Sequence, residues 1–170
     1  GPKLVRLSPF DHVFNPLAPN YRSSPKITRY VKTLGELEDE ATTRPDLHYS
    51  KAALAAAREN RNKSSGMSPS DWAKQEAIQI DGFGNLQTYY QTGYVEILEF
   101  EGSIYDEFTG VFLKDYIITI IDRNLELRKE PSPSWIGAGT KVHAGWRLRP
   151  DNLYAMGPLD NLVGMQYRID

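Results

Sequence analysis

Histidine is the residue type in this sequence best suited to metal binding or acid–base chemistry, and it occurs at His12, His48 and His143. None of these lies within helical spacing of another, so no two form the adjacent-turn pair of a helical zinc site. Cysteine is absent, which excludes disulfides, zinc–thiolate sites and thiol nucleophiles. Carboxylates are plentiful, yet no pair stands out by its spacing. We interpret each histidine as a surface or packing residue, and their convergence in space stays open from sequence alone.

Two glycine-containing stretches could suggest nucleotide binding, and both lack the required pattern. Gly82-Phe83-Gly84 has no third glycine, and no predicted strand leads into it. The stretch from Gly137 to Lys141 lacks the Gly-Lys-Ser/Thr order of a phosphate-binding loop. No Gly-x-Ser-x-Gly hydrolase elbow occurs in the sequence. We interpret both stretches as turns or loops. The sequence therefore predicts no catalytic, cofactor-binding or metal-binding residue, and no enzyme.

Tyrosines gather in one part of the chain and could stack on single-stranded nucleic acid. They are Tyr89, Tyr90, Tyr94, Tyr105 and Tyr116. Such stacking works beside interleaved lysine or arginine, and residues 82–109 contain neither. We therefore expect these tyrosines to pack in the core or at an interface, and Trp135 and Trp146 to anchor the later strands.

The overall charge also argues against a nucleic-acid-binding module. The 170 residues carry 22 acidic and 20 basic side chains, a net charge of −2. Duplex binding relies on phosphate neutralisation by lysine and arginine, so we expect no measurable duplex-DNA affinity at moderate salt. The longest apolar run, near residues 116–121, is far shorter than the roughly 20 residues of a membrane-spanning helix.

The first half of the chain predicts two short strands followed by helices. The strands are expected over 3–7 and 12–14. Ser24 and Pro25 resemble a helix start, and Ile27, Tyr30, Val31, Leu34 and Leu37 then recur at helical spacing. A capping box over 33–36 predicts a second helix, and the Ala-rich stretch 50–62 predicts an exposed helix that docks weakly.

The second half predicts mainly strands. After a linker over 63–70 come a helix with Trp72 and a short helix ending at Gly93. Strands are expected over 94–104, 111–121 and 124–129, joined as consecutive antiparallel neighbours, with a further strand over 141–148. The apolar phase of the first of these strands slips between Ile97 and Leu98, which predicts a bulge or a crossing between packing layers. The apolar run of 111–121 predicts a strand covered on both faces.

These elements together predict an α+β fold in which helices pack on an antiparallel β meander and the chain ends in a truncated helix. Residues 1–2 are interpreted as the scar of a removed tag, and both ends are expected to be cut from a longer protein. The closing helix over 158–170 has an apolar stripe and stops without a cap. We therefore expect the chain alone to be monomeric or weakly associated.

Several stretches, in order along the chain, resemble the portal proteins of short-tailed bacteriophages. They are 8–18 (SPFDHVFNPLA), 24–27 (SPKI), 33–37 (TLGEL), 89–102 (YYQTGYVEILEFEG) and 146–170 (WRLRPDNLYAMGPLDNLVGMQYRID). The resemblance covers most of the chain apart from 44–70, and its motifs are structural landmarks rather than catalytic signatures.

The resemblance implies a structural protein of the virion. Portal subunits form a ring, usually of twelve, at one vertex of the phage head, which admits DNA driven by the terminase and later holds the tail adaptor. It implies that this chain is the outer wing, in contact with other portal subunits and with capsid or scaffold protein, terminase and adaptor. The wing strands and helices would then occupy 3–43, an insertion 44–70, a helix and strand block 71–156, and the start of a longer helix 157–170. A small enzyme or nucleic-acid-binding domain with an unusual site is the alternative, which a deep pocket with converging histidines and carboxylates would favour.

Overall fold

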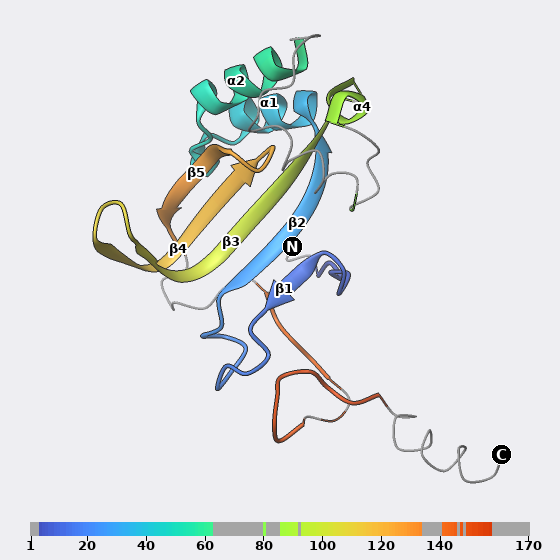
Figure 1. Cartoon of the computed structure of the whole chain (residues 1–170), viewed down its shortest axis with the longest axis vertical. Helices are drawn as coiled ribbons and strands as arrows, with labels where there is room; N and C mark the ends of the chain where they lie inside the picture. Colours follow the sequence, from blue (N-terminus) through green and yellow to red (C-terminus); the bar gives the residue numbers. More distant parts are fainter. Residues whose placement is uncertain are drawn as a thin grey trace, which may run out of the picture.

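A five-stranded antiparallel sheet forms the centre of the molecule, so the chain is of the α+β class (Figure 1). The computed structural model describes residues 4–62, 80, 86–91, 93–133, 141–145, 147 and 149–157. The strands are β1 (His12–Phe14), β2 (Lys26–Thr33), β3 (Tyr94–Asp106), β4 (Val111–Ile121) and β5 (Leu125–Pro131). They lie side by side in chain order, and each neighbouring pair is antiparallel. The predicted strand over 12–14 is confirmed, and so is the predicted order of β3, β4 and β5 as consecutive antiparallel neighbours.

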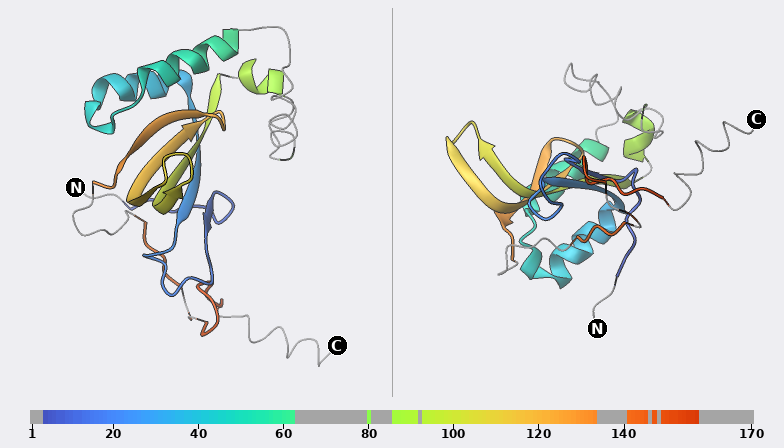
Figure 2. Two further views of the ribbon diagram at one scale, coloured as in Figure 1. Left: turned by 60° about the vertical axis from the view of Figure 1, so that its left-hand side comes forward. Right: turned by 90° about the horizontal axis from the view of Figure 1, so that it is seen from below.

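Helices lie across one end of the sheet (Figures 1 and 2). They are α1 (Leu34–Thr43), the 3-10 helix η1 (Pro45–Leu47), α2 (Lys51–Asn62) and α4 (Leu86–Gln91). The predicted capping box is confirmed, because the Thr33 side chain accepts from the Glu36 amide at 3.3 Å and Glu36 accepts from the Thr33 amide at 2.7 Å. The predicted short helix before Gly93 is confirmed as α4.

The hydrophobic core lies between α1, α2 and one face of the sheet. Its buried members are Leu37, Ala53, Leu54, Ala57, Val95, Ile97, Ile121 and Leu127. The weak docking expected of α2 is therefore wrong. Ala53 and Ala57 are buried together with Leu54, because small side chains let a helix approach its neighbours closely even when only one large apolar residue is present.

The helix predicted to start at Ser24 and Pro25 is replaced by β2. Along this strand Lys26 and Thr28 are buried, whereas Ile27 and Val31 are 43% and 45% exposed. The buried face of β2 is therefore the polar one. The apolar pattern predicts the opposite, with Ile27 and Val31 on a buried side. The Lys26 ammonium tolerates burial by donating to the carbonyls of Arg22 and Ser24 at 3.1 and 2.9 Å. Ser24 accepts from the Asn15 amide at 3.0 Å instead of capping a helix.

Two other predicted strands, over 3–7 and 141–148, are not found among the residues that the structure describes there. Residues 4–7 and 141–145 have no strand conformation, and only Arg147 and Met156 form an isolated antiparallel bridge. Leu4 and Val5 are 98% and 68% exposed, so this segment has no buried face of the kind that stabilises a strand. The predicted linker over 63–70, the helices with Trp72 and over 158–170, and both late tryptophans lie outside the described residues.

The irregularity expected in β3 lies further along the strand than predicted. Pairing with β2 and β4 is continuous through Ile97 and Leu98, and the register instead shifts between Gly102 and Ile104. Ile97 lies on the core face, and its neighbour Leu98 lies half-buried on the opposite face. On that opposite face, Ile118 and Ile120 of β4 are also half-buried. Strand β4 is therefore fully covered on one face only, and not on both faces as predicted for 111–121.

Substitution of Gly102 by alanine is expected to lower the free energy of unfolding by about 1–3 kcal/mol. Gly102 has a φ of +151°, and a Cβ atom there would lie 3.0 Å from Pro25 Cα. Gly35→Ala is the matched control, because a Cβ there meets nothing within 4 Å and alanine favours the helix. Urea unfolding of both variants measures the difference. Equal effects at the two positions would contradict this account of the bulge.

Candidate functional site

A pocket of about 590 Å³ opens at the end of the sheet away from the core helices. Strand β1 contributes His12 and Phe14, which share one face because side chains alternate along a strand. Strand β2 contributes Tyr30, and the segments 4–9 and 141–144 complete the walls. The register places His12 opposite Thr28, so this pocket continues the same sheet face that carries the core.

His12 is held by two hydroxyl groups. Its Nδ1 lies 2.9 Å from Thr28 Oγ1 and its Nε2 lies 2.7 Å from the Tyr21 hydroxyl. Burial, followed by the charges of Lys141 and Lys26, lowers the pKa of His12 below its ordinary value of 6.5. The imidazole is therefore neutral at pH 7, with one ring nitrogen donating and the other accepting.

Phe14 is the centre of an aromatic cluster in the pocket wall. Its ring centroid lies 5.2 Å from those of Tyr21 and Tyr154 and 5.6 Å from that of His143. The Lys26 ammonium lies 4.8 Å from the centre of the Tyr21 ring, a cation–π contact. His12 and His143 therefore converge on one pocket although they are far apart in the sequence.

Lys141 ties the late segment to the sheet beneath the pocket. Its Nζ lies 2.8 Å from Glu99 Oε1 and 2.9 Å from Glu101 Oε2, and its side chain is only 6% exposed. Burial alone would favour the neutral amine, but Glu99 and Glu101 outweigh it and raise the pKa of Lys141 above its ordinary value. Lys141 is thus a charged tether rather than a free amine nucleophile. The sequence analysis missed this contact. Its one trace in the sequence is that Glu99 and Glu101 are two residues apart on a predicted strand and so share one face.

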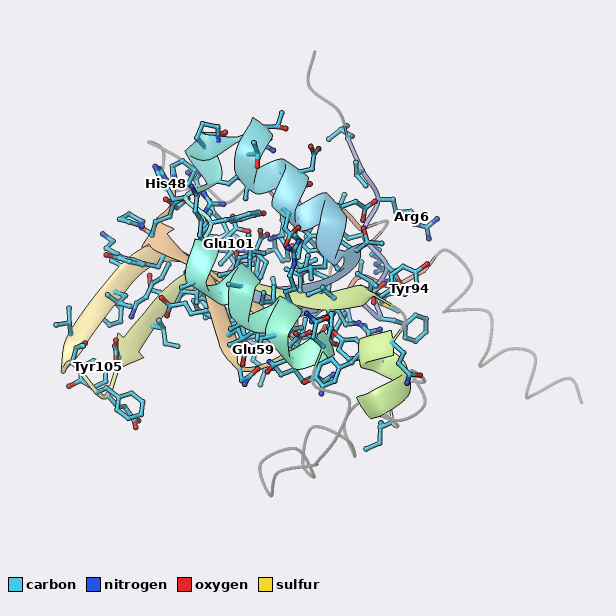
Figure 3. The ribbon with its side chains drawn as sticks, turned by 90° about the horizontal axis from the view of Figure 1, so that it is seen from above. Arg6, His48, Glu59, Tyr94, Glu101 and Tyr105 are labelled. Carbon is cyan, nitrogen blue, oxygen red and sulfur yellow. The ribbon has the colours of Figure 1, made fainter. Side chains whose placement is uncertain are left out.

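The third histidine lies elsewhere. His48 is exposed, and its Nδ1 lies 2.7 Å from Glu130 Oε2 on β5 (Figure 3). Over the described part of the chain, no three histidine or carboxylate side chains are grouped to hold a metal ion. The pocket walls combine the aromatic cluster around Phe14 with the side chains of segment 4–9.

A second polar cluster lies at the opposite end of the sheet, between α2, α4 and the β4–β5 turn. Arg61 of α2 donates to both carboxylate oxygens of Asp122, at 2.7 and 2.9 Å, and the two side chains are 7% and 1% exposed. The Tyr89 hydroxyl donates to Asp122 Oδ1 at 2.8 Å and accepts from the Glu96 amide at 2.6 Å. Burial, followed by the charge of Asp122, raises the pKa of Tyr89 far above its ordinary value. This cluster connects elements distant in sequence, so we assign it a structural role.

The five tyrosines of the predicted packing group have different environments. Tyr89 is 2% exposed and packs against Tyr90 with ring centroids 5.6 Å apart. Tyr94 and Tyr105 are 48% and 56% exposed. Core packing is thus confirmed for Tyr89, and Tyr105 lies at the surface.

His12 is expected to make stability depend on pH. Because its pKa is lower in the folded chain, the unfolded chain takes up a proton first as the pH falls below about 6.5, and the free energy of unfolding decreases from there. His12→Asn removes this titration, so its unfolding midpoint should fall less steeply between about pH 7 and pH 5. Between about pH 8 and pH 9 the two curves should run parallel. Identical pH profiles throughout would contradict the assignment.

None of the helices in the described ranges is long and apolar enough to cross a membrane. No protein-family model and no curated protein sequence matches this chain.

Proposed function

We propose that the chain is the outer wing of a portal subunit, a structural protein of a phage virion. The observation that carries the proposal is the way the portal-like stretches meet. Stretches 8–18 and 24–27 contain β1 and the start of β2, and stretch 89–102 contains most of β3. Lys26 pairs with Glu101 and Ile27 pairs with Phe100, so stretches remote in sequence are strand neighbours.

The last portal-like stretch reaches the same place. Its residues 147 and 156 pair with each other, and the Leu153 amide donates to the Pro16 carbonyl at 2.8 Å. Stretches 8–18, 24–27, most of 89–102 and part of 146–170 are therefore joined around β1, β2 and β3, while 33–37 begins α1 at the other end of the sheet. Such contacts between ordered motifs are expected when the motifs describe a common structure. Segment 44–62, which lies outside the resemblance, contributes η1 and α2 at the other end of the sheet.

In this role the chain has protein partners and no chemistry of its own. The proposed partners are other portal subunits in a ring, usually of twelve, and capsid or scaffold protein, terminase and tail adaptor at the head vertex. The proposal includes the finer architecture, in which helices pack on the β meander and the closing helix leads into a longer one. Genomic DNA would pass through the channel of the ring without being bound by this wing.

The test is the assembly state of a longer chain. A protein that extends these residues in both directions with their natural neighbouring sequence is expected to form ring-shaped particles with rotational symmetry in electron micrographs. The present chain is expected to remain monomeric or weakly associated in light scattering. A longer chain that stays monomeric at every concentration tested would overturn the proposal.

The pocket is the one observation that favours the alternative of a small enzyme or nucleic-acid-binding domain. It brings His12 and His143 together, while Glu99 and Glu101 are paired with Lys141. Both ring nitrogens of His12 are already hydrogen-bonded, which leaves it poorly placed to act as a free base. Fluorescence anisotropy with duplex DNA near physiological salt tests the nucleic-acid-binding form of this alternative. A submicromolar dissociation constant would favour the alternative.

A further inference from the structure

The hairpin that joins β3 to β4 exposes a cluster of large apolar side chains at its tip. We define the hairpin tip as residues 104–112. Its exposed apolar members are Ile104 (41%), Tyr105 (56%), Phe108 (103%), Val111 (51%) and Phe112 (62%). The hairpin extends past the rest of the sheet in the right-hand view of Figure 2. Tyr105 and Phe112 pair directly and so share one face of the hairpin, whereas Ile104 and Val111 lie on the other face, with Phe108 in the turn between the strands. Exposed apolar side chains gathered at one end of a hairpin favour a contact site there.

The conformation of the hairpin tip is fixed by its own hydrogen bonds. Asp106 Oδ1 accepts from the amides of Phe108 and Thr109 at 3.1 and 3.3 Å, and its Oδ2 lies 3.2 Å from Lys129 Nζ. Gly110 closes the turn with a φ of +69° and donates its amide to the Asp106 carbonyl at 2.8 Å. Phe108 is thus presented to solvent by an ordered turn, so little ordering cost remains for a binding partner to meet.

The aromatic pocket lies on the other side of the molecule. Figure 3 shows Arg6, a residue of the pocket wall, and Tyr105, a residue of the hairpin tip, at opposite sides. A chain therefore cannot place its own tip in its own pocket, whereas a second copy can. A contact between two different surfaces of identical chains repeats from copy to copy and closes a ring when the rotation permits.

The two surfaces match in chemistry. The tip offers Phe108, and the pocket offers aromatic walls and a volume of about 590 Å³, within the range of sites that enclose small molecules. The residues described as lining the pocket include no carboxylate. Arg6 at its wall is exposed, and Glu107 beside Phe108 is exposed. Neither Arg6 nor Glu107 has an ion-pair partner within the described ranges.

We infer that the pocket receives the hairpin tip of a second copy of this chain, with Phe108 inserted among the aromatic rings and Glu107 paired with Arg6. The inference rests on the proposed function in that a ring holds neighbouring copies in this head-to-tail relation. One inserted tip is a small contact, so it is weak between free chains and strengthened when a closed ring holds many copies together.

Cysteine cross-linking tests the contact directly, because the chain contains no cysteine. A tagged chain carrying Thr109→Cys is mixed with a chain carrying Leu4→Cys, and a short bismaleimide reagent is added. Thr109 is exposed at the tip, and Leu4 is a 98% exposed residue of the pocket wall. Ala55→Cys, exposed on α2, replaces Leu4→Cys as the matched control. We expect the mixed product from the first pair only, and equal yields from both pairs would overturn the inference.

Charge reversal identifies the ion pair. Glu107→Arg or Arg6→Glu alone is expected to reduce the cross-linking yield roughly tenfold, and both changes in every chain should restore it. Phe108→Ala should reduce the yield by at least as much. A yield insensitive to all three changes would overturn the inference.

The same experiment separates this contact from the proposed function. Rings of the longer chain that give no cross-link would overturn the hairpin contact and leave the portal function standing. Cross-linked head-to-tail oligomers of a longer chain that never closes into rings would overturn the portal function and leave the hairpin contact standing.

Discussion

Replacing Arg61 with methionine is expected to lower the free energy of unfolding by about 3–5 kcal/mol. The substitution keeps an unbranched side chain on α2 but leaves the Asp122 carboxylate buried, 1% exposed, without its cation. Tyr89 would remain as a neutral donor at 2.8 Å, which cannot balance a full charge. The loss should be large because Arg61 also holds α2 to β3 through the Tyr94 carbonyl at 2.8 Å.

Two further variants make the Arg61 measurement specific. Arg58→Met lies on the same helix and removes a surface ion pair with Glu38, so it should cost less than about 1 kcal/mol. Adding Asp122→Asn to Arg61→Met removes the buried carboxylate charge that Arg61 balanced and should recover part of the loss. Urea unfolding monitored by circular dichroism gives all three values. A loss for Arg61→Met no greater than that for Arg58→Met would show that the buried pair contributes little.

Replacing Lys141 with methionine is expected to have a comparable effect, about 3–5 kcal/mol at neutral pH. The variant leaves Glu99 and Glu101 on the same face of β3 without the ammonium that now lies 2.8 and 2.9 Å from them. It also releases the segment that forms one wall of the pocket. Without the ammonium the two carboxylates repel each other across one face of the strand, so replacing one of them as well should recover part of the loss.

The control for Lys141 is a lysine paired at the surface. Lys32 lies 2.5 Å from Glu40 with both side chains about one-third exposed, so Lys32→Met should cost less than about 1 kcal/mol. Glu101→Gln added to Lys141→Met should restore part of the stability. Thermal unfolding of these variants at neutral pH provides the comparison. A double variant no more stable than Lys141→Met would show that repulsion between the two carboxylates is not its cause.

The elements that could be predicted from sequence are those with a local code. The Thr33–Glu36 capping box is read from residues three apart, and both of its hydrogen bonds form. The run from Val111 to Ile121 and the turn before it are also local signals. Strand β2 could not be predicted this way, because its buried face consists of Lys26 and Thr28, whose burial depends on partners elsewhere in the chain.

The pocket could not be predicted for a related reason. His12 reaches it through the pairing of β1 with β2, and His143 reaches it because Lys141 is held by Glu99 and Glu101. Neither the strand pairing nor the Lys141 contacts can be predicted from the spacing of residues along the chain. Glu99 and Glu101 alternate on a predicted strand, but by spacing this pair does not stand out among the many carboxylates of the chain, and it does not identify a partner.

The pairing of β2 with β3 also has a consequence for how the chain folds. The hairpins β3–β4 and β4–β5 close over a few residues, whereas β2 reaches β3 only after the long segment between Thr33 and Tyr94 has been looped out. Local closures are fast and distant ones slow, so the β3–β5 unit should form before β2 and β1 dock onto it. The entropy of closing a loop grows only with the logarithm of its length, and doubling this one would cost about 0.6 kcal/mol. An insertion between Thr33 and Tyr94 that leaves α1 and α2 intact would therefore add little to the cost of closing this loop, while the strands at either end of it stay in register.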